Sequence, residues 1–148
     1  MALPHAISQG TARGRGLAVA YYVAQAVLAV FWWVSMASFA SVRARFELNP
    51  NGPRALDAFL VADLVVFVAG SLASAWAISR RSRRAGFFTA FTAGGVAYAT
   101  LYLLSWVALE ETGTAGVAPM VAALVASTVI ALDTSKESDD ESRSPSAS

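Results

Sequence analysis

Residues 16–34 read GLAVAYYVAQAVLAVFWWV, a stretch without a single charged side chain. A helix on the surface of a soluble bundle keeps a polar face at helical spacing, and this stretch is apolar on all sides. A helix needs roughly 20 predominantly apolar residues to cross a bilayer. The stretch therefore predicts a transmembrane helix. The sequence SFA at 38–40 resembles a signal-peptide cleavage site, but the apolar run is longer than the usual signal region of about 7 to 15 residues, which favours an uncleaved helix.

The rest of the chain repeats this arrangement. Only 14% of the 148 residues are charged and 56% are hydrophobic, whereas soluble domains average about 25% charged residues. The charges are spaced to leave four runs of spanning length, and Asp63 is the one charge inside them. The ten-residue alternation of a membrane β-barrel strand is missing from the sequence. We predict an all-α integral membrane protein, a four-helix bundle with helices at about 17–42, 55–78, 86–109 and 115–132.

The predicted transmembrane domain covers 16–132 and is flanked by two polar segments. An N-terminal segment, 1–15, precedes it, and the tail DTSKESDDESRSPSAS follows at 133–148. The tail is rich in Ser and charged residues and nearly lacks apolar ones, a composition typical of disorder. We therefore expect short loops between the helices and a disordered tail after them.

Basic residues are distributed unequally between the two ends of the predicted bundle. Four spans place both termini and the loop SRRSRR at 79–84 on one side, and that side carries most of the Arg and Lys residues. Cytoplasmic segments carry such an excess. We expect a protein of the cell membrane with both termini in the cytoplasm and with a topology signal formed by Arg80, Arg81, Arg83 and Arg84. The abundance of Arg and Ala indicates a prokaryotic source.

Residues that carry common chemistry are scarce. The chain has no Cys, and its one histidine, His5, lies before the first predicted helix. Thiol chemistry, thiolate metal sites, haem ligation by an intramembrane His and a Ser–His pair are therefore all disfavoured. The formal net charge of +1 is too small to indicate nucleic-acid binding. We expect no enzymatic activity, no cofactor, no metal and no nucleic-acid partner.

Small residues four apart let transmembrane helices approach closely, and three predicted helices offer them. The second has Gly70 and Ser74, the third has Gly94, and the fourth has Ala122. The same residues could serve packing within one bundle or association between copies.

Asp63 lies about 8 Å, by helical rise, below the outer end of the second predicted helix. A carboxylate facing lipid costs about 2.5–3.5 kcal/mol on insertion scales, so Asp63 should face the bundle, on the same helical side as Gly70. Similar counts on the neighbouring helices predict a polar layer in the outer half of the membrane. Its members are Asp63, Arg43, Arg45, Ser38, Tyr102 and Ser105.

Two roles are open for Asp63. The favoured interpretation is a structural clamp, in which an ionised Asp63 pairs with Arg43 or Arg45. The alternative is a proton or cation site open to the outside. The corresponding functions are a non-enzymatic accessory protein, scaffold or module that binds lipid or protein, and a small oligomeric transporter or channel coupled through Asp63. The expected partners are the lipid bilayer and either another membrane protein or a second copy of the chain.

Overall fold

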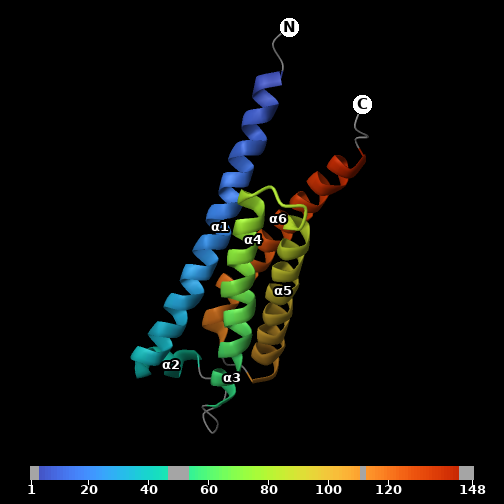
Figure 1. Ribbon diagram of the computed structural model, residues 1–148. Helices are drawn as coiled ribbons and strands as arrows, with labels where there is room; N and C mark the ends of the chain where they lie inside the picture. Colours follow the sequence, from blue (N-terminus) through green and yellow to red (C-terminus); the bar gives the residue numbers. More distant parts are fainter. Residues whose placement is uncertain (1–3, 47–53, 111–112, 144–148) are drawn as a thin grey trace.

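The computed structural model (Figure 1) describes residues 4–46, 54–110 and 113–143, and side chains at 12–44, 57, 59–109 and 113–136. Every regular element in these ranges is helical. In chain order they are α1 (Pro4–Ser38), α2 (Ala40–Phe46), α3 (Arg54–Asp63), the π-helix η1 (Leu64–Gly70), α4 (Ser71–Ser79), α5 (Ala85–Glu110), the 3₁₀ turn η2 (Thr114–Gly116) and α6 (Val117–Arg143).

Four helical stretches are long and apolar enough to cross a membrane. They are Ala12–Ser38, Phe59–Ser79, Ala85–Leu109 and Thr114–Lys136. They lie side by side, with both ends of the chain at the same end of the bundle (Figure 1). The prediction of an all-α membrane protein with four transmembrane helices is confirmed.

The second span is not a regular α-helix. Its first part, α3, continues through η1 into α4. A π-helix closes its hydrogen bonds over five residues instead of four, and such turns are rare inside α-helices. The turn rotates the residues after it relative to those before it. The regular helical face that we expected to relate Asp63 to Gly70 is therefore interrupted.

Small polar side chains fill the interior, and large apolar side chains face outward. The fully buried polar residues come from the last three spans and are Ser71, Ser74, Thr89, Thr92, Thr100 and Ser127. Thr100 donates a hydrogen bond of 2.7 Å to the Val96 carbonyl, and Ser74 donates one of 2.9 Å to the Gly70 carbonyl. Leu28, Phe31 and Leu109 are among the large apolar residues left exposed. This distribution suits helices surrounded by lipid, where apolar contacts outside the bundle are as good as those inside.

Glycines and small residues set the distance between the second and third spans. A Cβ built on Gly70 would lie 2.9 Å from Thr92 Oγ1, and one on Gly95 would overlap the side chain of Val66. Ser74 is buried beside them, and its Oγ lies 3.1 Å from Thr92 Oγ1. The structure thus brings Gly70 and Ser74 to the same helix–helix contact.

Gly94 and Ala122 do not pack between helices of the bundle, which leaves for them only the alternative of association between copies. Gly94 is exposed, and a Cβ added there would meet nothing within 4 Å. Ala122 is also exposed on α6. Two glycines stand next to each other in α5, and residues one apart in a helix point in directions about 100° apart. The contact with the second span therefore belongs to Gly95.

The sixth helix runs further than expected. We expected disorder from Asp133, but α6 continues to Arg143. Extending an existing helix adds one hydrogen bond for each residue fixed and avoids the cost of nucleation, so a polar segment can follow an apolar one into helix. Residues 144–148 of the predicted tail lie outside the described residues.

The basic loop between α4 and α5 begins with a close helix cap. The Ser82 N–H donates to the Ala77 carbonyl at 2.9 Å, and the Arg81 N–H donates to the Ile78 carbonyl at 3.2 Å. These two bonds form a Schellman motif, whose left-handed position is usually occupied by glycine. Here that position is Arg81, with a φ of 50°. The left-handed region costs an L-residue about 1–2 kcal/mol, so the loop holds an arginine where glycine would be more stable.

Adjacent glycines in α5 provide a matched test of this packing. Gly95→Ala should lower the free energy of unfolding by about 1–3 kcal/mol, as overpacking does, because the branched side chain of Val66 has little rotamer freedom. Gly94→Ala should raise it by up to about 1 kcal/mol through helix propensity. Unfolding in mixed micelles by increasing dodecyl sulfate measures both. Equal effects at the two positions would contradict the assigned helix face.

Candidate functional site: an intramembrane carboxylate and an apolar groove

Asp63 is the last residue of α3 and is partly buried where the second span faces α1. Trp33 of α1 donates a hydrogen bond from its indole Nε1–H to Asp63 Oδ2 at 3.1 Å. An indole can only donate, and an ionised carboxylate can only accept. The pair therefore satisfies two groups that both need a partner in a bilayer, and it joins the first span to the second.

The energy of this contact depends on the protonation state of Asp63. A hydrogen bond contributes about 1.5–3 kcal/mol to an ionised carboxylate and about 0.5–1.5 kcal/mol to a neutral carboxyl group. Removing one partner leaves the other polar group without its hydrogen bond. Trp33 was not predicted as a partner of Asp63. The sequence did offer a sign of this pairing, because an indole on a neighbouring helix can donate a hydrogen bond but cannot accept one.

Arg43 pairs with a different carboxylate from the one we expected. Its guanidinium donates to Asp57 Oδ1 at 2.9 Å, and both side chains are solvent-accessible. Asp57 lies six residues before Asp63, which is about 9 Å nearer the end of the helix. An arginine that pairs with Asp57 keeps its charge at the membrane surface. The side chain of Arg45 lies outside the described residues.

The other members of the predicted polar layer do not gather around Asp63. Ser38 and Ser105 are exposed. The ring of Tyr102 lies 5.0 Å from that of Phe59 and 6.3 Å from that of Trp106, measured between centroids. The hydrogen bond described for Asp63 comes instead from Trp33.

A second polar contact joins α1 to α6 in the other half of the bundle. Tyr21 Oη lies 2.8 Å from Ser127 Oγ and donates to the Ala123 carbonyl at 3.0 Å. Ser127 in turn lies 3.5 Å from Gln25 Oε1. Gln25 thus takes part in a contact between α1 and α6. Three buried polar atoms have no partner among the described residues: Tyr22 Oη, Gln25 Nε2 and Ser71 Oγ.

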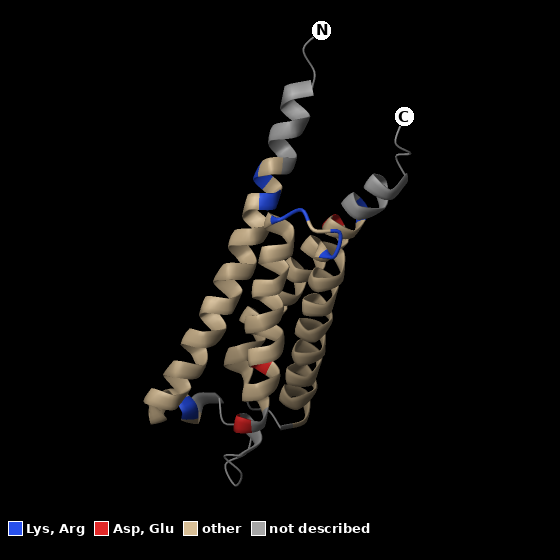
Figure 2. Cartoon of the chain, viewed as in Figure 1, with Lys and Arg blue, Asp and Glu red and all other residues tan. Residues whose placement is uncertain are grey.

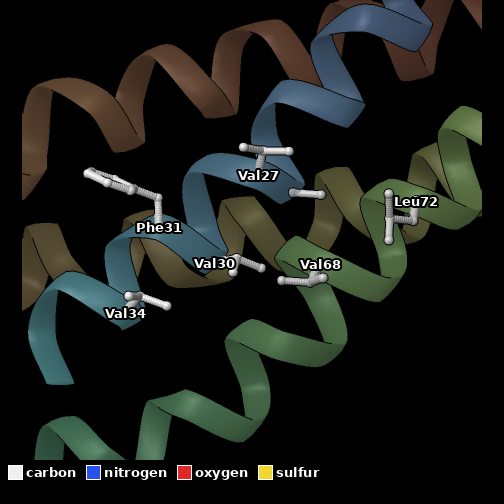
Figure 3. Close-up of a pocket in the computed structure, with 7 residues that line it drawn as sticks. Val27, Val30, Phe31, Val34, Val68 and Leu72 are labelled. Atoms are coloured by element: carbon white, nitrogen blue, oxygen red, sulfur yellow. The ribbon is translucent and has the colours of Figure 1, made fainter. Parts of the chain in front are cut away.

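An apolar groove of about 400 Å³ lies between α1 and the second span. Figure 3 shows side chains from α1 on one wall and side chains from η1 and α4 on the other. The lining residues carry only hydrocarbon side chains and are Ala26, Val27, Val30, Phe31, Val34, Val68 and Leu72. The sequence analysis did not predict this groove, because it arises from the angle between two helices.

The groove lies between two firmer contacts of α1. Tyr22 is fully buried and packs against Ala75 and Ile78 near one end. The Trp33–Asp63 hydrogen bond joins the helices near the other end. In Figure 1, α1 leans away from the other spans towards α2. The groove is thus held open by the tilt of α1 and bounded by contacts that fix this tilt.

Charged side chains occupy the two ends of the bundle differently. Basic residues near the start of the first span, in the α4–α5 loop and at the end of the last span lie at the end that carries both termini (Figure 2). Arg80, Arg81, Arg83 and Arg84 of the predicted topology signal are exposed. The charged residues coloured on α2 and α3 lie towards the opposite end (Figure 2), and these helices include Arg43, Asp57 and Asp63. Within the described residues, no group of three His, Cys, Asp or Glu side chains is placed to hold a metal ion.

No protein family, curated protein or solved structure matches this chain. The functional conclusions therefore rest on the geometry of the bundle and on the chemistry of its side chains.

A double-mutant cycle tests the pairing of Asp63. Trp33→Phe keeps the aromatic packing but removes the donor, and it should lower the free energy of unfolding by about 1–3 kcal/mol. Combined with Asp63→Asn, it should show a coupling of at least about 0.5 kcal/mol. Trp76→Phe, on the exposed side of α4, is the matched control. Dodecyl sulfate unfolding measures the cycle.

A second double-mutant cycle tests the pairing of Asp63 with Arg43 that the sequence predicted. Arg43→Gln with Asp63→Asn should show coupling below about 0.5 kcal/mol, because Arg43 pairs with Asp57. Strong coupling there, with none to Trp33, would restore the arginine clamp.

Proposed function

We propose that this protein is a non-enzymatic membrane module that acts by binding another component of the membrane within the bilayer. The observation that carries the proposal is the apolar groove between α1 and the second span. Binding grooves for apolar ligands are concave and lined mainly by hydrocarbon side chains. An accessory protein or scaffold needs such a surface and needs no reactive group.

The exposure of the groove walls supports this function. Val27 is 60% exposed and Leu72 is 48% exposed, although both line a concave surface. The contacts between the second and third spans are closed instead by glycines and hydroxyl groups. The second span thus contacts α5 through small residues and contacts α1 through larger apolar side chains, beside which the groove lies.

A second candidate function is a small oligomeric transporter or channel that couples to protons or cations through Asp63. Its support is the position of an intramembrane carboxylate directly before a π-helix, since π-helical turns occur frequently at functional sites. The hydrogen bond from Trp33 gives this carboxylate a structural role as well. Proton release from purified protein on addition of candidate substrates, lost in Asp63→Asn, would favour the transporter over the binding module.

Native mass spectrometry of protein extracted gently from its own membranes tests the proposed function. The wild type should carry a discrete added mass, from a lipid or a protein. Val27→Trp fills the groove and should lose that mass. Val125→Trp, at a site 57% exposed on α6, should keep it. A wild type without added mass, or equal loss in both variants, would contradict the proposal.

We propose that the protein lies in the cell membrane with both termini in the cytoplasm. The concentration of arginines at the end with both termini supports it, through the positive-inside rule. A fluorescent reporter that folds only in the cytoplasm should be active when fused after Ser148. It should be inactive when inserted after Glu111. The reverse pattern would invert the topology.

A further inference from the structure

We infer that the loop between α4 and α5, residues 80–84, binds the phosphate headgroup of an anionic phospholipid. We call these residues the arginine loop. Their surface is separate from the apolar groove, so the inference goes beyond the proposed function. It is carried by three features of the loop: the charge of its side chains, its level at the membrane surface, and one arginine held in an unfavourable backbone conformation.

The arginine loop concentrates positive charge that the rest of the described protein does not neutralise. Four of its five residues are arginines, and all four side chains are exposed: Arg80, Arg81, Arg83 and Arg84. Within the described part of the chain, no carboxylate forms an ion pair with any of them. The loop stands out in blue at the end of the bundle that carries both termini (Figure 2). Its guanidinium groups are therefore free to bind an external anion.

The arginine loop lies at the level of lipid headgroups. The second span ends at Ser79 and the third begins at Ala85, so no intervening segment carries the arginines away from the membrane surface. Basic residues directly outside a transmembrane helix are attracted to anionic lipids. A guanidinium can also donate two parallel hydrogen bonds to one phosphate group. Phospholipids of the surrounding bilayer are the anions that this position brings within reach.

Hydrogen bonds within the chain fix the backbone of the arginine loop, and Ser82 takes part in most of them. Its N–H donates to the Ala77 carbonyl at 2.9 Å, and its carbonyl accepts from the Ala85 N–H at 2.9 Å. Its Oγ accepts from the Arg84 N–H at 3.2 Å. These N–H groups are already used, so an anion would be bound by the guanidinium groups. A fixed backbone presents those groups with a reduced entropic cost of binding.

Arg81 indicates that the loop is adapted to binding as well as to folding. In the described part of the chain it is the one non-glycine residue with a positive φ, 50°. Glycine adopts this conformation freely, whereas it is unfavourable for residues with a Cβ. Strain of this kind is concentrated at ligand-binding and active sites. A topology signal needs only positive charge beside the span, which the other three arginines already supply. The Arg81 guanidinium is therefore a contact to the headgroup.

The test uses purified, delipidated full-length protein in a non-ionic detergent, with bound lipid counted by native mass spectrometry. Phosphatidylglycerol should bind at least about tenfold more tightly than phosphatidylcholine with the same acyl chains. Arg83→Gln combined with Arg84→Gln should weaken phosphatidylglycerol binding at least about tenfold. The matched control, Arg13→Gln combined with Arg15→Gln, removes the same charge near the start of the first span. It should weaken binding less than about threefold.

Arg81→Gly separates lipid binding from stability. It should raise the dodecyl sulfate fraction at which the protein unfolds, because glycine suits the left-handed position. It should also weaken phosphatidylglycerol binding about fivefold, through the lost charge. Arg81→Lys keeps the charge and should bind within about threefold of the wild type. If the double variants do not fold, Arg81→Gly still decides the question, since it is expected to be more stable than the wild type.

Four results would overturn the inference. Equal affinity for the two lipids would show that the protein does not distinguish the headgroups. Equal loss in the two double variants would assign binding to the overall charge of this end of the bundle. Wild-type affinity in Arg81→Gly would remove Arg81 from the site. Displacement of the lipid by an equal concentration of glycerol phosphate would identify a site for a soluble phosphate ester. Each of these results would leave the proposed function of the groove standing.

Discussion

Inside a bilayer no water is present to satisfy a polar group, and this constraint shapes every helix of the protein. The hydroxyl groups of Thr89 and Thr100 bond back to carbonyls of their own helix. The carboxylate of Asp63 takes the indole of Trp33 across a helix–helix contact. Since lipid is as apolar as leucine, large side chains gain little by facing inward. Small hydroxyl residues share the interior with a few larger side chains such as Tyr22 and Val96, and many valines and aromatic residues are left on the outside.

Two polar contacts determine how α1 sits against the bundle. The Tyr21–Ser127 contact joins it to α6 in one half of the membrane, and the Trp33–Asp63 contact joins it to the second span in the other. Between them α1 is packed mainly by apolar residues and leans away from its neighbours (Figure 1). The groove is the result of this arrangement. The tilted α1 does not follow the second span along its whole length, and the groove lies where the two diverge.

Sequence alone predicted the fold because lipid solvation leaves a strong signal in composition. Long uncharged runs and their flanking charges located the four spans to within a few residues, with α5 expected at 86–109 and found at Ala85–Glu110. Details that depend on rotation about a helix axis were less predictable. Gly94 and Gly95 are equivalent by composition, and their roles differ only through the direction in which each faces. The pairing of Asp63 with Arg43 was expected from charge alone, and the structure pairs Arg43 with Asp57 and Asp63 with the indole of Trp33 instead. The π-helix and the groove have no signature in the pattern of apolar residues.

The connections between helices imply an order of assembly. The third and fourth spans are neighbours in sequence and pack along their lengths, so they can form a hairpin soon after insertion. The short loop from Ser79 to Ala85 brings the second span to this hairpin, where Gly70 and Gly95 allow close approach. The first span enters the membrane earliest, yet its partners are inserted after it. It can pair with the second span as soon as that span is inserted, whereas its polar contact with Ser127 of α6 can form only when the last span is in place.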